Sequence, residues 1–302
     1  MQDLPTRMEL HAIRTLTLTD RQFLLGETEG RDTAITGLLS LAQGEGRQPV
    51  VVMVHGSGGH RGASIALWQR QVNSMGAAAF LLDGFTGRGL VSVAGDQGSL
   101  GRLAFVLDIY RALAVLAVHP AVDPARIALL GFSRGGQGAL YAGMERFHRL
   151  WNASGVTPIG TAAVYPDCGT RYIGDTAMLP APLRVFHGRP DDFNPIGPAR
   201  DHVARLREAG HDAGIIEYDH AHHGFDNPLS PGAALVVGSQ SVRNCRIEER
   251  EPGLLVNAAT GLPFSYADPC VATDVHVCGN AVAGAALRRD VLAWLRGLLR
   301  LS

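Results

Sequence analysis

Arg126-Ile-Ala-Leu-Leu-Gly-Phe-Ser-Arg-Gly-Gly-Gln-Gly-Ala-Leu140 is the stretch of sequence that decides the fold. Its apolar run, Ile127 to Leu130, predicts a buried strand, and the residues after Gly135 are able to form a helix. Gly131-Phe-Ser-Arg-Gly135 lies between the two, in the strand, turn and helix context of a nucleophile elbow. The glycines suit such a turn because side chains two residues either side of Ser133 would collide with its strained backbone. The other interpretation is a glycine-rich turn that carries an ordinary serine.

Apolar strands alternate with helical segments along the rest of the chain. Val50–Val54 is a continuous apolar run, typical of a strand buried on both faces of a parallel sheet, and Ala77–Asp83 is expected to be a second buried strand. Further strands are expected at 161–165, 183–186 and 215–218, and helices at 63–75, 103–118, 195–209 and 287–301. This alternation predicts an α/β fold with a doubly wound, mainly parallel sheet. The looser alternation of residues 9–19 and 33–41 predicts an antiparallel hairpin at the sheet edge.

We expect residues 1–302 to form a single domain, because no internal repeat or low-complexity tract divides the sequence. The exception to its regularity is the stretch 228–279, which has weak periodicity and is too long for a plain connection. Three of the four cysteines, Cys245, Cys270 and Cys278, lie in this excursion. A Cys245–Cys270 disulfide would pin it, and the alternative is that these three and Cys168 are all reduced thiols.

Composition and charge exclude several classes of partner. The formal net charge is −1 and no basic run is present, which argues against binding to nucleic acid or to an anionic membrane surface. The longest apolar stretch, 103–118, is interrupted by Asp108 and Arg111, so no membrane span is expected. The N-terminal stretch lacks the apolar core of a signal peptide, which predicts a cytoplasmic protein, or a periplasmic one if the chain is a processed form. The sequence leaves the oligomeric state open.

Three more strand ends carry polar residues, and such residues meet at the carboxyl edge of a parallel sheet. His55-Gly-Ser-Gly-Gly59 follows the strand at 50–54, and its glycines let backbone N–H groups approach a ligand oxygen. It lacks the spacing of a phosphate-binding or dinucleotide-binding loop, so an oxyanion loop is the favoured interpretation and a plain glycine turn the alternative. His187-Gly-Arg-Pro-Asp-Asp192 and His220-Ala-His-His-Gly-Phe225 follow two later strands.

Ser133, Asp191 and His223 occur in the chain order of the Ser…Asp…His triad of an α/β-hydrolase sheet. Serine is a poor nucleophile until an imidazole accepts its proton, and a carboxylate fixes the tautomer of that imidazole. Asp192 remains an alternative to Asp191, and His222 an alternative to His223.

Together these motifs resemble the dienelactone hydrolase family of α/β-hydrolases across nearly the whole chain. The resemblance is carried by the 55–59 loop, Gly131–Gly136, Tyr165-Pro166, His187-Gly188-x-x-Asp191 and Ala221-His-His-Gly-Phe-Asp226. Dienelactone hydrolase itself has a cysteine nucleophile, whereas this chain has a serine, as many family members do. The stretch Leu82–Gly89 and the cysteine-bearing excursion are similar to a bacterial subgroup with many exported members, which keeps a periplasmic location open.

The resemblance implies that Ser133 is the nucleophile, His223 the general base and Asp191 the orienting acid. The backbone N–H of Arg134, with that of Ser57 or its neighbour Gly56, would then form the oxyanion hole. The expected function is a cofactor-free serine hydrolase that cleaves a small-molecule carboxylic ester or lactone through an acyl-enzyme intermediate. An acyltransferase or peptidase with the same triad and a non-catalytic binding protein on a hydrolase fold are the alternatives.

Other polar residues near these motifs have competing interpretations. Tyr165 and Cys168 lie after a predicted strand and, with His222, are candidates to line the substrate pocket; Cys168 is otherwise a buried thiol without a role. The side chain of Arg134 is either a partner for a substrate carboxylate or a surface residue at a helix start. We expect no metal site at His220, His222 and His223, because loop residues this close in sequence rarely converge on one ion without carboxylate or thiolate ligands.

Overall fold

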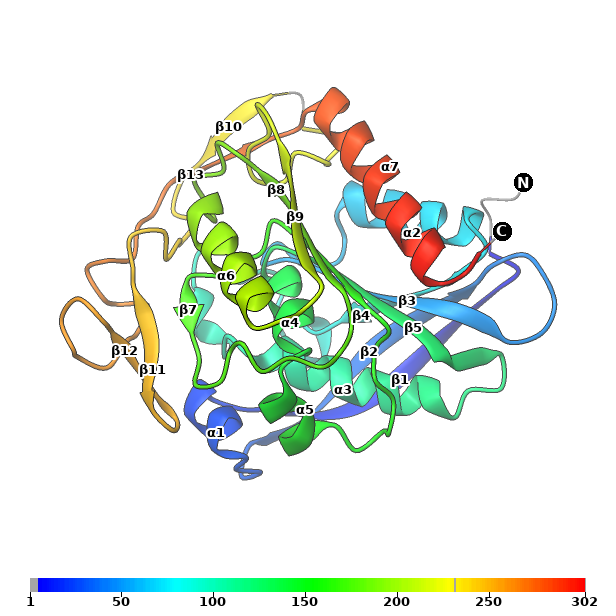
Figure 1. The fold of residues 1–302 in the computed structure, drawn as a ribbon, viewed down its shortest axis with the longest axis horizontal. Coiled ribbons are helices and arrows are strands. Elements are labelled where there is room, and N and C mark those ends of the chain that lie inside the picture. The colour runs from blue at the N-terminus through cyan, green and yellow to red at the C-terminus, as the bar shows by residue number, and fades with distance from the viewer. Residues whose placement is uncertain (1–4, 231, 302) are drawn as a thin grey trace.

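The computed structural model describes residues 5–230 and 232–301, and within them an eight-stranded sheet forms the centre of the molecule (Figure 1). The strand order is β1-β2-β4-β3-β5-β6-β8-β9. The five neighbouring pairs from β4 to β9 are parallel, whereas β2 pairs antiparallel with both β1 and β4. The predicted mainly parallel sheet with an antiparallel N-terminal hairpin is therefore confirmed. The bounds are β1 Arg7–Thr17, β2 Arg31–Leu41, β3 Gln48–Val54, β4 Ala78–Asp83, β5 Val122–Phe132, β6 Thr161–Val164, β8 Leu183–Gly188 and β9 Ala213–Tyr218.

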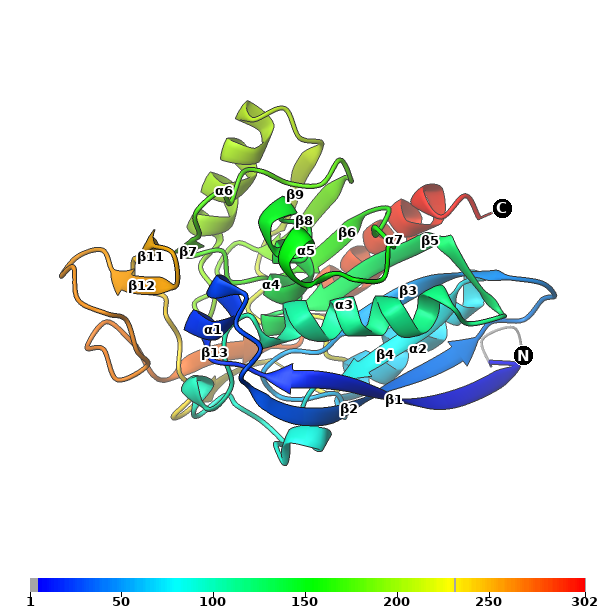
Figure 2. The ribbon, with the colours of Figure 1, turned by 90° about the horizontal axis from the view of Figure 1, so that it is seen from below.

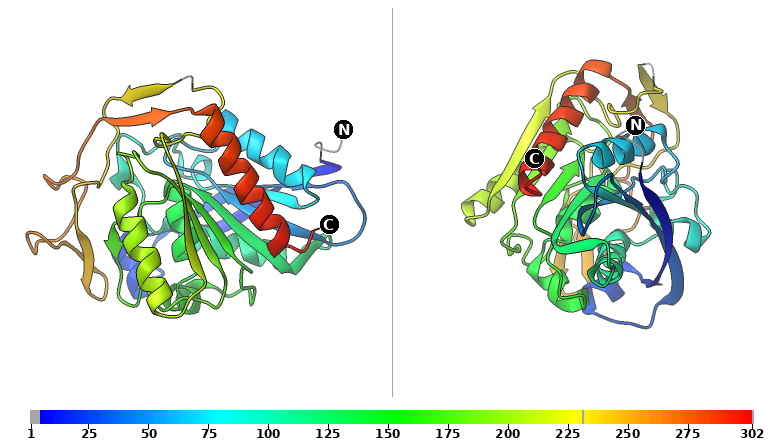
Figure 3. Two further views of the ribbon diagram at one scale, coloured as in Figure 1. Left: turned by 45° about the horizontal axis from the view of Figure 1, so that its top comes forward. Right: turned by 90° about the vertical axis from the view of Figure 1, so that its right-hand side faces the viewer.

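Helices cover both faces of this sheet (Figures 2 and 3). Helices α2 (Ala63–Ser74) and α7 (Ala281–Leu298) bury Trp68, Leu287 and other apolar side chains against one face. Helices α3 (Ala104–Ala117), α4 (Arg134–Tyr141) and α6 (Ile196–Glu208) contribute to the apolar core on the other face. Every residue of β3 is buried, as its continuous apolar sequence predicts for a central parallel strand. No helix in the described ranges is both long and apolar enough to cross a membrane.

Two short helices were not expected from the sequence. Helix α1 (Asp20–Leu25) interrupts the predicted hairpin, and it is bounded by a Thr19–Gln22 capping box and by Gly26 in the left-handed conformation. Helix α5 (Glu145–Trp151) lies in the connection between α4 and β6. The two pack together, with the rings of Phe23 and Trp151 stacked at 5.4 Å between centroids. Helices of one or two turns gain most of their stability from such packing, which periodicity along the chain does not reveal.

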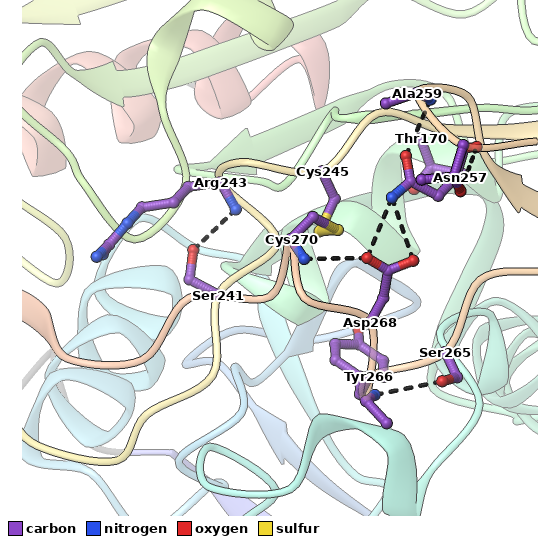
Figure 4. The surroundings of a disulfide bond; sticks show 12 residues. Thr170, Ser241, Arg243, Cys245, Asn257, Ala259, Ser265, Tyr266, Asp268 and Cys270 are labelled. Atoms are coloured by element: carbon purple, nitrogen blue, oxygen red, sulfur yellow. Dashed lines mark hydrogen bonds between the residues drawn. A yellow bond between two sulfur atoms is a disulfide. The ribbon is translucent and has the colours of Figure 1, made fainter. Parts of the chain in front are cut away.

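The excursion at 228–279 contributes strands to two small sheets and contains a disulfide. Strand β10 (Ala233–Val236) pairs with β13 (Val275–Cys278), and β11 (Ile247–Glu251) pairs with β12 (Leu254–Asn257) and β7 (Thr170–Arg171). These segments lie on the side of the molecule away from the two chain ends (Figures 1 and 3). A disulfide joins Cys245 to Cys270, with 5.0 Å between their Cα atoms (Figure 4). Cys168 and Cys278 are free.

Candidate active site

Ser133 occupies a sharp turn between β5 and α4, as the elbow pattern predicts. Its backbone has φ 54° and ψ −119°, a conformation that L-residues rarely adopt. A Cβ atom on Gly131 would lie 2.1 Å from the carbonyl oxygen of Gly135, and one on Gly135 would lie 2.1 Å from that of Val54. Only glycine fits at either position, because the opposing atoms belong to the backbone of the turn and of β3.

The structure brings together three residues from three distant loops. The Ser133 Oγ lies 2.9 Å from His223 Nε2, and His223 Nδ1 lies 2.8 Å from Asp191 Oδ2. All three residues are at least nine-tenths buried. When the Asp191 carboxylate accepts a hydrogen bond from Nδ1–H, the Nε2 lone pair of the imidazole faces the serine hydroxyl. This arrangement can remove a proton from Ser133.

Asp191 and Asp192 have different partners, which separates the two alternatives left by the sequence. Asp191 Oδ1 accepts hydrogen bonds of 2.9 Å from the backbone N–H groups of Phe193 and Asn194, so its second oxygen is aimed at His223. Asp192 instead accepts hydrogen bonds from the backbone and the ring of His276, at 2.9 and 2.7 Å. Burial opposes ionisation of Asp192, but the bonds from His276 outweigh it and hold the pKa of Asp192 below its ordinary value.

His223 is held on several sides. Its ring packs between those of Tyr165 and Phe193, with centroids 4.7 and 4.6 Å away. Its carbonyl oxygen accepts the backbone N–H of Cys278 at 3.1 Å, a contact from strand β13 of the excursion. Three residues further along, Asp226 anchors the same loop.

Asp226 is a buried carboxylate whose role the sequence did not indicate, although it closes the motif that contains His223. Its Oδ1 accepts the Tyr165 hydroxyl at 2.7 Å, and its Oδ2 accepts Trp68 Nε1 at 2.8 Å and the hydroxyl of Ser64. The Tyr165 ring that contacts His223 is therefore fixed through its own hydroxyl. The sequence shows only that an acid follows His223 by three residues, and this spacing does not reveal which side chains the acid binds.

The 55–59 loop lies directly beside Ser133, since a Cβ on Gly56 would be 3.1 Å from Ser133 Cβ. The Gly56 carbonyl accepts the Nδ1 proton of His55 at 2.8 Å and the backbone N–H of Gly59 at 3.1 Å. Burial lowers the pKa of His55 to about 4, so the ring is neutral, and its Nε2 accepts the N–H of Gly84 at 3.3 Å. In a trans peptide the C=O and N–H point in opposite directions, so anchoring the Gly56 carbonyl also fixes the direction of the Ser57 N–H.

Arg134 presents a backbone N–H beside Ser133, and its side chain makes hydrogen bonds that hold a neighbouring segment in place. Its N–H is the first of helix α4 and has no acceptor within the helix. Its buried guanidinium donates to Gln97 Oε1 and to the carbonyl of Gly101, both at 2.8 Å. The same Gln97 Oε1 accepts the Ser57 hydroxyl at 3.0 Å. The interpretation of Arg134 as a surface residue is wrong, because its side chain pins the 97–101 segment to the elbow.

A cavity of about 30 Å³ lies beside Ser133. Its lining is mostly polar and comes from the elbow, the 55–59 loop, the 97–102 segment, the loops after β6 and β8, and the excursion: Ser57, Gln97, Arg102, Ser133, Arg134, Gln137, Asp167, Phe193, Asn194, Gln240, Ser241, Val242 and Tyr266. The four residues of the excursion were not predicted, because nothing in the local sequence of 228–279 shows which part of it faces Ser133.

Tyr165, Cys168 and His222, which we expected in the pocket, are not among the described residues that line this cavity. The Tyr165 hydroxyl points to Asp226, and His222 lies half-buried beside His276, with ring centroids 6.1 Å apart. Cys168 lines a separate cavity of about 380 Å³, and burial raises the pKa of its thiol. A position after a strand places a backbone at the rim but leaves the direction of its side chain undetermined.

Groups of side chains of metal-ligand type also occur in the structure. In the described ranges two such clusters have their donor atoms within 4.8 Å of one another, Glu9–His11–His119 and His55–His60–Asp83, and neither contains any of the histidines at 220, 222 and 223. In the second cluster both ring nitrogens of His55 already bond backbone groups.

Comparisons with known proteins place this chain in a family. Among solved structures, a dienelactone hydrolase-like promiscuous phosphotriesterase from metagenomic libraries matches with a TM-score of 0.60 and 17% identity, over 96% of this chain and 98% of the other. The α/β-hydrolase enzyme MGS-M1 from a Medee basin deep-sea metagenome library matches with a TM-score of 0.54 and 17% identity, over 97% and 99%. The esterase Est22 matches with a TM-score of 0.52 and 18% identity, over 73% and 74%.

At these identities the structural matches show the fold alone. No curated protein matches the chain. The model of the dienelactone hydrolase family matches residues 35–248, more than half of the sequence, and this stretch includes the elbow, the 55–59 loop and all three residues of the Ser133–His223–Asp191 chain. Family membership supports a hydrolase. This protein belongs to the dienelactone hydrolase family.

Proposed function

We propose that the protein hydrolyses a small-molecule carboxylic ester or lactone, with Ser133 as nucleophile. The observation that supports this most is the unbroken hydrogen-bonded chain from Ser133 through His223 to Asp191, beside a cavity. A non-catalytic scaffold would have no need of a serine held in a rarely populated conformation, since such a conformation costs about 1–3 kcal/mol. The esterase and phosphotriesterase named among the structural neighbours are consistent with ester hydrolysis.

In the proposed reaction the Ser133 Oγ attacks the ester carbonyl carbon as its proton passes to His223 Nε2. The carbonyl oxygen becomes an oxyanion, which accepts hydrogen bonds from the backbone N–H groups of Arg134 and Ser57. Collapse of this intermediate breaks the bond to the leaving oxygen, which takes the proton from the imidazolium and departs as an alcohol. Water then attacks the acyl-enzyme with His223 again as base, releasing the acid and regenerating the Ser133 hydroxyl.

Asp191 keeps the imidazole in the reactive tautomer and stabilises the imidazolium that forms. His55 and Gly59 hold the Gly56 carbonyl, so the Ser57 N–H is preorganised before substrate arrives. Preorganised donors cost no rearrangement at the transition state, and one such donor contributes on the order of 10² to 10³ in kcat.

Substitution of the nucleophile tests the proposal. Ser133→Ala should reduce turnover of p-nitrophenyl acetate by on the order of 10⁴ to 10⁶, with an unchanged far-UV circular dichroism spectrum. Ser265→Ala, at an exposed serine of the excursion, is the matched control and should retain wild-type turnover. Turnover by Ser133→Ala at the wild-type rate would reject Ser133 as the nucleophile. Product analysis in the presence of an alcohol separates hydrolysis from acyl transfer.

A further inference from the structure

Tyr165 lies directly after strand β6, where it contacts the loops that carry the acid and the base of the triad. Its ring packs against the imidazole of His223, with 4.7 Å between the ring centroids. Its carbonyl oxygen accepts a hydrogen bond from Asn194 Nδ2 at 2.9 Å, and the backbone N–H of Asn194 in turn donates to Asp191 Oδ1. Tyr165 therefore touches the base directly and the acid through one intermediate residue.

The backbone of Tyr165 is strained. Its φ is 39°, in the left-handed region that a residue with a bulky side chain rarely adopts. Such a conformation persists only where the surroundings fix it, and it is typical of functional sites. Here the N–H of Tyr165 donates to the carbonyl of Phe186 at 2.8 Å, and its carbonyl accepts the Asn194 side chain. The turn keeps the backbone joined to the sheet while the ring reaches the imidazole of His223.

The hydroxyl of Tyr165 is anchored by Asp226, which is 1% exposed. Asp226 Oδ1 accepts the hydroxyl at 2.7 Å. Its Oδ2 accepts Trp68 Nε1 at 2.8 Å and the hydroxyl of Ser64, both from helix α2. Both oxygens of this buried carboxyl group thus have partners, and a buried polar group that loses its partner destabilises the structure around it. The tyrosine ring and the loop that carries His223 are therefore fixed to the same helix.

Tyr165 and Asp226 together close a ring of contacts around the imidazole. Asp226 lies on the His223 loop and accepts the hydroxyl of the tyrosine whose ring packs against His223. At its other end the tyrosine reaches the Asp191 loop through its carbonyl oxygen. Small displacements of a reacting group matter, because a misplacement of about 1 Å can slow a reaction by about 10². The relative position of base and acid therefore depends on one side chain.

We propose that Tyr165 is a positioning residue for the triad and that Asp226 holds it in place. Tyr165 acts through His223, since its own hydroxyl donates to Asp226 and not to a substrate. The inference rests on the proposed hydrolysis by Ser133, and it concerns how the base is held, whichever ester is cleaved. A side chain with only a packing role would change the stability of the protein and leave kcat unaltered.

The test removes one hydroxyl group from each of two buried tyrosines. Tyr165→Phe keeps the ring and loses the bond to Asp226, so kcat for p-nitrophenyl acetate should fall by at least about fivefold, with KM within about twofold of the wild-type value. Tyr110→Phe is the matched control, because Tyr110 is 1% exposed in helix α3 and its hydroxyl donates to the Ala142 carbonyl at 2.8 Å. It should lower the urea midpoint by a similar amount and keep the wild-type kcat.

A milder variant decides the question if Tyr165→Phe does not fold. Ser64→Ala removes a different hydrogen bond to Asp226, from a half-buried position in the first turn of α2, and should lower kcat by about twofold or more. Ser74→Ala is its control: Ser74 lies exposed at the end of the same helix, and its hydroxyl donates to the carbonyl of Gln71. This variant should keep the wild-type kcat.

Two results would overturn the inference while leaving Ser133-dependent hydrolysis intact. One is a wild-type kcat in folded Tyr165→Phe, or in Ser64→Ala where the first variant does not fold. The other is an equal loss of kcat in Tyr165→Phe and Tyr110→Phe, which would show a general effect of stability. Failure of the proposed function would look different, because the wild-type protein would turn over no p-nitrophenyl ester in a Ser133-dependent way, and the inference would then fall with it.

Discussion

Asp191 and Asp192 are chemically identical neighbours, but the turn that contains them places their carboxylates against different hydrogen-bond partners. The backbone N–H groups of Phe193 and Asn194 hold one oxygen of Asp191, which leaves the other for His223. Asp192 faces His276 of strand β13. Motif spacing favoured Asp191, but the partner of Asp192 lies more than eighty residues away and had no local signal in the sequence.

The pair gives a prediction at the scale of single residues. Asp191→Asn should lower kcat/KM for p-nitrophenyl acetate by on the order of 10⁴, because the amide no longer stabilises the reactive tautomer and the imidazolium of His223. Asp192→Asn weakens exposed hydrogen bonds with His276 and should lower kcat/KM by less than about tenfold. Steady-state kinetics of the two isosteric variants measure this difference in kcat/KM. Equal losses of kcat/KM in the two variants would contradict the proposal that Asp191 orients His223.

At the scale of elements, the long apolar strands and amphipathic helices could be predicted, and the short elements could not. The sequence of β3 predicts a central strand by itself, whereas α1 and α5 depend on packing against each other. The excursion was predicted only as an irregular stretch, because its strands are short and pair with residues far away, such as β7. The positions of the excursion residues that line the cavity depend on that pairing and on the disulfide.

The elbow makes a prediction about its glycines. Gly135→Ala should reduce both turnover of p-nitrophenyl acetate and the free energy of unfolding, because its Cβ would lie 2.1 Å from the carbonyl oxygen of Val54, the last residue of β3. Gly197→Ala is the matched control: it lies in helix α6 with open space around it and should be neutral or stabilising by up to about 1 kcal/mol. Urea unfolding and ester turnover of both variants provide the measurement. A fully active, equally stable Gly135→Ala protein would show that the elbow has a different backbone.

The disulfide makes a second prediction at this scale. Replacing Cys245 and Cys270 together by serine should lower the free energy of unfolding by up to about 3.5 kcal/mol, the chain entropy of a closed loop with a sequence separation of 25 residues. Cys278→Ser, at a free and half-buried cysteine, is the control and should change stability little. Urea denaturation midpoints compare the three proteins under non-reducing conditions. Identical midpoints for the double variant and the wild type would mean that the bond does not constrain the unfolded chain.

At the scale of the whole molecule, stability should depend on pH through histidines buried in neutral form. Burial lowers the pKa of His55 and of His202 to about 4, below the ordinary value of about 6.5 expected in the unfolded chain. Between these two values the unfolded chain binds more protons than the folded one, so stability falls as the pH falls from about 6.5 to about 4. Each histidine should cost about 2 kcal/mol at pH 5 relative to pH 7.5.

Urea unfolding at the two pH values measures this effect. His202→Gln, which cannot titrate, should lose about 2 kcal/mol of the pH dependence, and His202 lies outside the proposed catalytic machinery. A pH dependence as large as that of the wild type in this variant would show that His202 is not held neutral in the folded state.

Labelling by a fluorophosphonate tests the central claim most directly, because the probe reacts only with a serine activated by its surroundings. We predict that intact-mass analysis shows one probe bound per wild-type chain, that peptide mapping places it on Ser133, and that Ser133→Ala takes up none. His223→Ala should react far more slowly, because the base is missing. A wild-type protein that stays unlabelled, or is labelled at a serine other than Ser133, would contradict the account.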